Sequence, residues 1–358
     1  MDDGCSQEWQ QSRWEAIETL NETGNASVSN ASVHSVIPLK TSIVITTTSF
    51  LILFCVVSLA VNIVIISSAC FVRNKILPTL YISLSLAGAD TFSLFLYALG
   101  LVLFTLLPRG FGVVFNTPCF FLLVETLRMG AILTTIFHLA ALAGNHYMGI
   151  LKPLKYPVYM TRRNVRCVAI LLWTIPSALL LIKVFYIENT LGEPCTADFL
   201  ITKEFRMTFA IPLFTTLGLM MFIYCHIYAL VEKRKKTNHI KLCSKPGSVN
   251  RRHQRNQSSN SITRSQVNKK AIVTTLMILG SVIFGWVPAF AYFVLFCKDC
   301  LFCEYWKLGT LKEHIILVII NFLMISKTAT NSYVYACRMK ELKLALKGMR
   351  KQSLKMAR

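Results

Sequence analysis

Charged residues are scarce in this chain, and acidic residues are scarcer than basic ones. Only 15% of the 358 residues are charged, against about 25% in an average soluble domain. Hydrophobic residues make up 54% of the chain and occur in long runs without alternation. These runs exclude a water-soluble enzyme and a disordered chain. The chain also lacks a nucleophile–base pair, a phosphate-binding glycine loop and a His-Glu-x-x-His motif, so we expect no enzyme activity, no cofactor and no metal site.

Seven apolar segments are each long enough to cross about 30 Å of hydrocarbon as a helix. They are longer than the roughly 10-residue strands of a membrane barrel, and they do not alternate. The sequence therefore predicts an all-α membrane protein, a bundle of seven transmembrane helices that satisfies its own backbone inside lipid. The segments are Ile43–Phe71, Leu77–Leu106, Cys119–Ile150, Val165–Tyr186, Met207–Val231, Ala271–Phe296 and His314–Cys337.

With seven spans, the segments richest in Lys and Arg all fall on one side of the membrane. Residues 233–270 carry basic residues and no acidic ones, and the segment after residue 337 is also strongly basic. The positive-inside rule places this side in the cytoplasm. We therefore expect a third cytoplasmic loop at about 233–268 and a cytoplasmic tail at 338–358. The net charge of +21 then acts as an orientation signal and a contact for anionic membrane lipid, and it does not indicate nucleic acid.

The opposite, extracellular side then holds the N-terminal segment, residues 1–42. This segment is rich in acidic residues and carries Asn-x-Ser/Thr sequons that begin at Asn21, Asn25 and Asn30. Such sequons accept glycans on the surface of secreted and extracellular segments. The sequence predicts a multi-pass plasma-membrane protein with a glycosylated extracellular N-terminus and a transmembrane domain at 43–337.

Each expected span carries a short motif, and the motifs follow one another in order. They are Val61-Asn62-Ile63-Val64-Ile65 in the first span, Leu84-Ser85-Leu86-Ala87-Gly88-Ala89-Asp90 in the second, Asn145-His146-Tyr147 with Pro153-Leu154-Lys155-Tyr156 at the end of the third, Trp173 and Pro176 in the fourth, Pro212 and Tyr224 in the fifth, Gly285-Trp286-Val287-Pro288 in the sixth, and Asn331-Ser332-Tyr333-Val334-Tyr335 in the seventh. On these motifs the chain resembles the rhodopsin-like (class A) G-protein-coupled receptors over roughly Ile43–Met349. It resembles an atypical member, because Asn-His-Tyr stands where the family has Asp-Arg-Tyr.

The resemblance implies a cell-surface receptor that converts extracellular ligand binding into activation of a heterotrimeric G protein, with arrestin as a further partner. It implies a short amphipathic eighth helix at Arg338–Lys347 on the inner leaflet. The family's activation switch would correspond to residues in the third, fifth, sixth and seventh spans, namely Asn145, His146, Tyr147, Tyr224, Trp286, Pro288, Asn331 and Tyr335.

Polar residues near the middle of three spans form a candidate polar core. Asn62, Asp90 and Asn331 need partners inside the lipid, which makes them functional candidates, with simple helix-packing hydrogen bonds as the alternative. Trp286 lies two residues before Pro288, and a proline bends a helix because it removes a backbone donor. This bend is either a two-state switch or a fixed kink.

The Asn145-His146 pair departs from the family in a way that changes the local electrostatics. Arg makes a charged fork to an acid, and a neutral His does not. The acid that the family places at the inner end of the sixth span is replaced here by Asn268. Two hypotheses follow. Either the inactive state is less firmly latched and basal signalling is raised, or coupling to the G protein is weak or lost.

An acid and a lysine occur near mid-membrane depth in two different spans. In the family, the position of Lys327 faces a sodium pocket around the acid that matches Asp90, and the position of Thr135 belongs to the same pocket. A buried, unpaired charge is costly in lipid. We therefore expect Asp90 and Lys327 to form an ion pair that makes the receptor insensitive to sodium. The alternative is that the Lys327 side chain extends elsewhere.

The third span carries a candidate ligand-binding pair in its outer half. Glu125 and Arg128 lie three residues apart and so on one face of a helix. Arg128 occupies the position at which amine receptors carry an acid, which disfavours a monoamine ligand. Its fork suits a carboxylate or phosphate, so the candidate ligands are an acidic small molecule, a lipid or a peptide, and the alternative is an internal Glu125–Arg128 pair. Lys183 and Trp286 complete the candidate ligand site.

The outer cysteines suggest disulfides. The resemblance implies a bond between Cys119, at the start of the third span, and Cys195 in the second outer loop. The sequence from Cys119 to His146 is longer than the family usually has, so we expect the top of this span to be shifted or bulged. A second outer cluster favours a loop disulfide over zinc, which needs a fourth ligand, and its connectivity stays open; it consists of Cys297, Cys300 and Cys303, with Cys5 as a further candidate.

Two other classes of membrane protein are alternatives. A retinal protein needs a lysine where this chain has Ile325, and Lys327 lies too far along the span. A channel or transporter predicts a repeated half or glycine-broken helices at mid-membrane, and the sequence has neither. A receptor is therefore the function that the sequence favours.

Overall fold

The computed structural model describes residues 36–72, 77–113, 118–187, 200, 202–243, 277, 279–296 and 311–356. The elements of regular structure in these ranges are all helical. In chain order they are α2 (Val36–Ser68), η1 (Ala69–Phe71), α3 (Pro78–Leu101), η2 (Val102–Leu106), α4 (Leu107–Phe111), α5 (Pro118–Leu151), α6 (Tyr156–Tyr159), α7 (Arg162–Ile182), η3 (Lys183–Ile187), α8 (Lys203–Cys243), the Trp286 helix (Leu279–Leu295), α10 (Leu311–Arg338) and α11 (Lys340–Met356).

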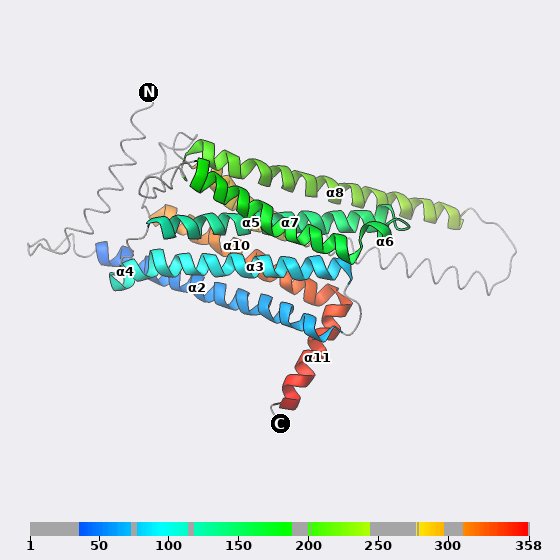
Figure 1. Cartoon of the computed structure of the whole chain (residues 1–358), viewed down its shortest axis with the longest axis horizontal. Coiled ribbons are helices and arrows are strands. Elements are labelled where there is room, and N and C mark those ends of the chain that lie inside the picture. The colour runs from blue at the N-terminus through cyan, green and yellow to red at the C-terminus, as the bar shows by residue number, and fades with distance from the viewer. Residues whose placement is uncertain are drawn as a thin grey trace, which may run out of the picture.

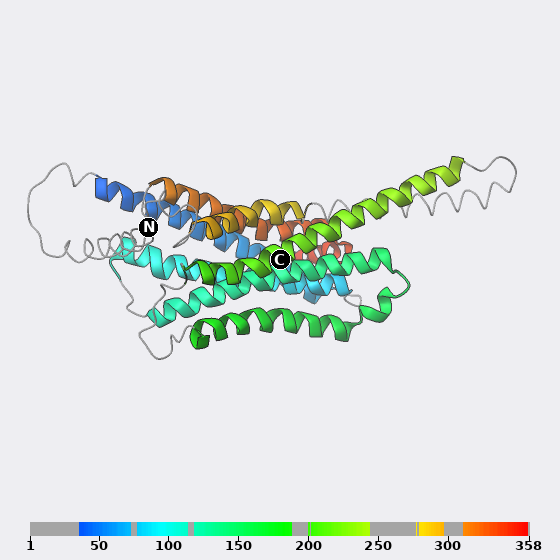
Figure 2. The same cartoon turned by 90° about the horizontal axis from the view of Figure 1, so that it is seen from above.

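Long helices that run side by side form the body of the molecule (Figures 1 and 2). Within the described residues, 6 helices are long and apolar enough to cross a membrane, and the Trp286 helix is a shorter apolar one. These helices correspond to the seven predicted spans, so the prediction of an all-α bundle is confirmed.

α8 and α11 extend well past the predicted ends of their segments. α8 begins at Lys203 and continues to Cys243, so the first part of the expected 233–268 loop is helical. α11 covers Lys340–Met356 instead of Arg338–Lys347. Hydropathy misses these extensions because Lys, Arg, Glu and Gln are good helix formers although they are polar.

α5 lies at the centre of the bundle. It packs against α3, α7 and α8, and 61% of its most apolar stretch is buried, compared with at most 33% in the other membrane-length helices. Gly130 permits the contact with α7, since a Cβ here would lie 3.0 Å from Ser177 Oγ. The polar groups on α5 are therefore enclosed by neighbouring helices.

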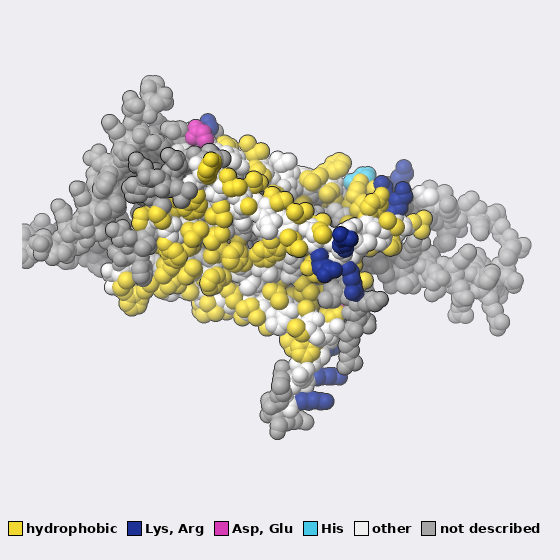
Figure 3. All heavy atoms as spheres, viewed as in Figure 1, with side chains coloured by type: hydrophobic (Ala, Val, Ile, Leu, Met, Phe, Trp, Pro, Cys, Tyr) yellow, Lys and Arg dark blue, Asp and Glu magenta, His cyan; other side chains and the backbone are white. Residues whose placement is uncertain are grey.

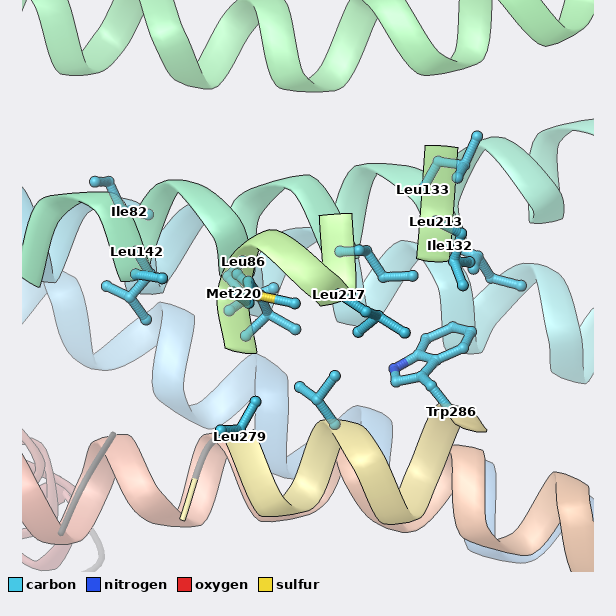
Figure 4. Close-up of a cluster of buried hydrophobic side chains, with 14 of the residues drawn as sticks. Ile82, Leu86, Ile132, Leu133, Leu142, Leu213, Leu217, Met220, Leu279 and Trp286 are labelled. Carbon is cyan, nitrogen blue, oxygen red and sulfur yellow. The ribbon is translucent and has the colours of Figure 1, made fainter. Parts of the chain in front are cut away.

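Buried apolar side chains from several helices fill the interior of the bundle, and Figure 4 shows part of this cluster. The indole of Trp286 reaches into this cluster beside buried aliphatic side chains. Inside lipid, close packing of such side chains stabilises helix association, because the surrounding lipid tails are equally apolar. Members of the cluster are Ile82, Leu86, Ile132, Leu133, Leu142, Leu213, Leu217, Met220, Leu279 and Trp286.

Basic side chains are concentrated at one end of the described part of the bundle. At one end, called the Val36 end below, α2 and α8 begin; at the other, the α11 end, α5 finishes and α11 turns steeply away from the bundle (Figure 1). Apolar side chains cover the middle of the visible surface, and Lys and Arg gather at the α11 end and along α11 (Figure 3). This is the distribution expected of a protein with one basic side.

Several predicted sites lie outside the described residues. They are the sequons at Asn21, Asn25 and Asn30, the cysteines Cys5, Cys195, Cys297, Cys300 and Cys303, and Asn268. These assignments stay predictions.

Candidate functional site

The predicted ion pair between α3 and α10 is present. Lys327 Nζ lies 3.1 Å from Asp90 Oδ1, and the two side chains are 0% and 1% exposed. Asn331 Nδ2 donates to the other carboxylate oxygen of Asp90, Oδ2, at 3.2 Å. The Asp90 carboxylate is thereby held by a cation and an amide donor from the same helix, which is what a buried carboxylate requires.

The polar core also reaches the Trp286 helix and α2. Ser281 donates to Asn331 Oδ1 at 3.3 Å. On the α2 side, Ser332 donates to Asn62 Oδ1 at 2.7 Å, and Asn62 donates to the backbone carbonyl of Ser58 at 2.9 Å. Asn62 therefore ties α2 to α10 and does not contact Asp90 through any of these bonds.

Thr135 of α5 is buried but stays outside this network. Its hydroxyl makes no hydrogen bond to any part of the chain that the structure describes. The structure therefore brings Asp90, Lys327 and Asn331 together as predicted, and leaves Thr135 without a hydrogen bond to them.

Trp286 lies against the ion pair. The ammonium of Lys327 is 5.5 Å from the centroid of the Trp286 ring, within cation–π range. Trp286 also stacks on Phe290, with ring centroids 5.4 Å apart. The indole thus links the polar core to the aromatic residues nearer the Val36 end.

Gly285 brings the Trp286 helix into direct contact with α10, and the two run side by side in Figure 2. A Cβ at Gly285 would lie 2.6 Å from Lys327 Cβ and 3.3 Å from the Leu323 carbonyl oxygen. Only glycine allows this approach, so the stem of Lys327 occupies the space that another residue would fill. Pro288 follows on the same helix and removes one backbone donor there.

Asn145 joins three elements at the α11 end through neutral hydrogen bonds. Its Nδ2 donates to Thr79 Oγ1 of α3 at 2.8 Å, and its Oδ1 accepts from the Tyr156 hydroxyl of α6 at 2.9 Å. A neutral amide stands here where the family carries a charged acid, so this end of α5 is held without an ion pair among these groups.

The other polar residues of the predicted activation switch differ in their hydrogen bonding. His146 Nδ1 is enclosed and makes no hydrogen bond to the described residues. Tyr147 hydrogen-bonds through its hydroxyl to His226 Nδ1 of α8, at 3.0 Å. The hydroxyls of Tyr224 and Tyr335 are also buried without a hydrogen bond in the described ranges. Among these four residues, only Tyr147 is therefore tied by a side-chain hydrogen bond of its own.

Glu125 and Arg128 form an internal pair near the Val36 end. Arg128 donates from Nε to Glu125 Oε2 at 2.9 Å and from Nη2 to Oε1, a two-bond fork. The side chains are 21% and 22% exposed. Of the two interpretations of this pair, the structure shows the internal one, and the fork of Arg128 is already occupied. Lys183 lies at the start of η3, where α7 finishes at the same end.

His138 is a buried histidine that sequence reasoning missed. It lies on α5 and is fully buried; its Nε2 lies 2.9 Å from Ser85 Oγ, and its Nδ1 lies 2.8 Å from the Thr134 carbonyl oxygen. Trp173 of α7 donates to the same Ser85 hydroxyl at 3.2 Å. The three side chains join α3, α5 and α7. The signal that could have found this residue is a histidine within an apolar span.

Arg206 is a second residue that sequence reasoning missed. It lies in the first turn of α8, and its Nη1 donates to the carbonyl of Phe293 at 2.9 Å and closely to that of Phe296. Its Nε donates to the Leu200 carbonyl at 3.3 Å. The guanidinium also lies 4.8 Å from the Phe293 ring centroid. It caps the end of the Trp286 helix, where cations are stabilised by the helix dipole.

Neither a resident metal nor a disulfide pair can be assigned within the described residues. No group of three or more His, Cys, Asp or Glu side chains in these ranges is placed to hold a metal ion. Cys119, at the start of α5, is not among the free cysteines there. Because Cys195 lies outside the described residues, the Cys119–Cys195 bond stays a prediction.

Comparison with known proteins identifies the family. Residues 61–335 match the model of the 7 transmembrane receptor (rhodopsin family). Relatives include the octopamine receptor beta-2R of Chilo suppressalis, 23% identical over 71% of this chain and 69% of that protein, and the melanocortin receptor 4 of Danio rerio, 24% identical over 81% and 79%. The dopamine receptor 1 of Drosophila melanogaster is 24% identical over 60% of this chain and 45% of its own length. The chain therefore belongs to the rhodopsin family of seven-transmembrane receptors.

Proposed function

We propose that this receptor sits in the plasma membrane with its Val36 end outside, and that an extracellular ligand activates a heterotrimeric G protein at the α11 end. Family membership supports the receptor role. The orientation is supported by basic side chains exposed at the α11 end, which the positive-inside rule assigns to the cytoplasm (Figure 3). They include Lys152, Lys155, Arg162, Arg163 and Lys233.

One observation carries the proposed mechanism, namely the position of Trp286 between an aromatic stack and a buried ion pair. On one side Trp286 stacks on Phe290, and on the other its ring faces the Lys327 ammonium. A ligand that shifts the stack would move the ring that packs against the polar core. Binding shifts the equilibrium only if the ligand has different affinities for the two arrangements.

The proposed ligand is an acidic small molecule, a lipid or a peptide and not a monoamine. Octopamine and dopamine receptors are among the relatives, but an amine entering this receptor would meet the guanidinium of Arg128. That guanidinium is neutralised by Glu125. An incoming acid must either displace Glu125 or use another cation.

The α11 end supports raised basal signalling. Asn145 makes neutral hydrogen bonds to Thr79 and Tyr156, and His146 has no hydrogen bond through Nδ1 in the described residues. Neutral hydrogen bonds stabilise less than charge-assisted ones, so the inactive arrangement is weakly held. Loss of coupling is the second candidate, because the same substitutions remove the arginine that the family carries. α11 contributes the contact with anionic lipid, and arrestin is a further proposed partner.

A cell assay of the full chain tests the proposal. Ligand-free activation of a panel of Gα subunits is measured for the unchanged receptor and for His146→Arg, at matched surface expression. We expect measurable basal activation by the unchanged receptor and a change with His146→Arg. Absence of activation by both proteins across the panel would favour a receptor that has lost coupling. Detection of an N-terminal tag only after permeabilisation would contradict the orientation.

A further inference from the structure

Arg206 is a half-buried cation at the Val36 end, and the hydrogen bonds described above tie it to backbone carbonyls. No carboxylate of the described residues lies within ion-pair distance of it. Two other cations inside the described part of the bundle each have an acid, since Arg128 pairs with Glu125 and Lys327 with Asp90. The charge of Arg206 is instead balanced by backbone dipoles and a ring face in this part of the chain.

Within the described residues, backbone carbonyls use one edge of the guanidinium fully and the other edge only in part. Arginine carries five N–H donors. Both donors of Nη1 are directed to the end of the Trp286 helix, at Phe293 and Phe296. Nε makes one long bond of 3.3 Å to Leu200, and Nη2 makes no hydrogen bond to the described residues. The Nε–Nη2 edge is the edge that a carboxylate binds with two parallel bonds, and binding there would replace only the long bond to Leu200.

We propose that the Nε–Nη2 edge of Arg206 binds the carboxylate of an extracellular ligand whose body is apolar. The proposal rests on the orientation and receptor role given above, and it assigns the acid-binding role to Arg206 rather than to the Arg128 of the sequence analysis. A carboxylate is a stronger partner for a guanidinium than a neutral carbonyl, because both partners are charged.

The aromatic side chains around Arg206 favour a ligand that has an apolar body next to its carboxylate. Phe293 lies under the guanidinium, and Phe209 of α8 contacts Phe293 and Phe290 with ring centroids 5.5 Å and 6.3 Å away. Phe290 stacks on Trp286, whose ring faces Lys327. Aromatic rings therefore connect the Arg206 site to the polar core, and they suit an aryl or aliphatic chain next to the acid.

The geometry also explains how ligand binding at Arg206 would affect the position of the Trp286 helix. One edge of the guanidinium holds the backbone at the end of this helix, and the other edge would hold the ligand. A ligand that moves the guanidinium therefore moves the end of the helix directly and the aromatic stack with it. Arg206 would therefore couple the bound ligand to the Trp286 helix by direct contact, and no chain of intermediate residues is needed.

Thermal unfolding of the purified full-length receptor tests the proposal without depending on G-protein coupling. Three carboxylates are titrated, 4-phenylbutyrate, indole-3-acetate and octanoate, each beside its amide. We expect at least one carboxylate to raise the unfolding temperature while its amide does not. Arg206→Gln should raise the half-saturating concentration about tenfold or more, as loss of a charge-assisted pair predicts. Arg206→Lys keeps the charge without the fork, so its half-saturating concentration should lie between those of the unchanged receptor and Arg206→Gln. Lys203→Gln, which removes an exposed cation in the same turn of α8, serves as the matched control that retains the response.

Each variant is compared with its own ligand-free unfolding temperature, because Arg206 also caps a helix. If Arg206 is only a cap, Arg206→Gln lowers the ligand-free temperature and leaves the carboxylate response unchanged. That result overturns the proposal, as does an equal response to acid and amide, or no response to any of the three acids. Failure of G-protein activation in cells with an intact carboxylate response would instead contradict the proposed function alone.

Discussion

Lys327 and Asp90 meet in the middle of the bundle, with the ammonium 3.1 Å from the carboxylate and both side chains shielded from solvent. The pair joins α3 to α10, and the Trp286 ring lies over the same ammonium. One residue thereby supplies the positive charge of the polar core and a contact with the Trp286 helix.

Removing one partner of this pair should destabilise the receptor more than removing both. Lys327→Met leaves a buried carboxylate without its cation, which costs about 3–5 kcal/mol. The double variant Asp90→Asn/Lys327→Met leaves no unpaired charge, and the amide introduced in place of the carboxylate could still accept a hydrogen bond from Asn331. Thermal unfolding of purified protein should therefore rank the double variant above Lys327→Met. Equal losses in both would show that the pair is not coupled.

Sodium should have no specific effect on this receptor. The Lys327 ammonium already lies beside Asp90, so a sodium ion would meet a positive charge there. We expect the same unfolding temperature in sodium chloride and in N-methylglucamine chloride of equal ionic strength. Lys327→Asn should introduce a difference between the two salts. A sodium-specific shift in the unchanged receptor would contradict the internal-cation interpretation.

Gly285→Ala should separate the Trp286 helix from α10. The added methyl group would lie 2.6 Å from Lys327 Cβ, and overpacking of this kind costs about 1–3 kcal/mol. Gly280→Ala, on the same helix, is the matched control, because a Cβ there has nothing within 4 Å. We expect a lower unfolding temperature and altered basal signalling for Gly285→Ala alone. Similar behaviour of the two variants would show that the close contact is unimportant.

His138→Leu should cost more stability than Trp173→Phe. The histidine variant removes both ring nitrogens, so Ser85 loses one partner and the Thr134 carbonyl another. Trp173→Phe removes only the indole bond to Ser85. Loss of buried hydrogen-bond partners costs about 1–3 kcal/mol, and loss of one peripheral bond costs about 1 kcal/mol. The reverse order in denaturation experiments would mean that the histidine is held mainly by packing.

The Asp90–Lys327 pair was predictable from sequence because the energy of charge in lipid leaves few options. Two opposite charges near the same depth must pair or find water. The number of helices followed from the length of apolar runs in the same way. The number of helices needed no knowledge of which helices are neighbours, whereas the choice of Lys327 as the partner of Asp90 also used the family resemblance, in which the two positions face one pocket.

The contacts of Arg206 and His138 could not be predicted in this way. Arg206 binds backbone carbonyls, which every residue carries and which leave no mark in the sequence. The partner of His138, Ser85, lies on another helix, and hydropathy gives neither the rotation of a helix nor its neighbours. The sequence allowed Arg128 either to bind a ligand or to pair with Glu125, and only the three-dimensional structure distinguishes the two possibilities. The additional length of α8 was missed because its last part is polar.

The length of α8 has a mechanical consequence. The helix spans 41 residues without a break, or about 60 Å at 1.5 Å per residue, roughly twice the thickness of a hydrocarbon core. From Pro212 to Cys243 it measures about 46 Å. A tilt of about ten degrees at the proline would swing the far tip by roughly 8 Å, given that rise per residue. A rod of this length would act as a lever, so that a small adjustment near Arg206 would become a larger displacement at Cys243.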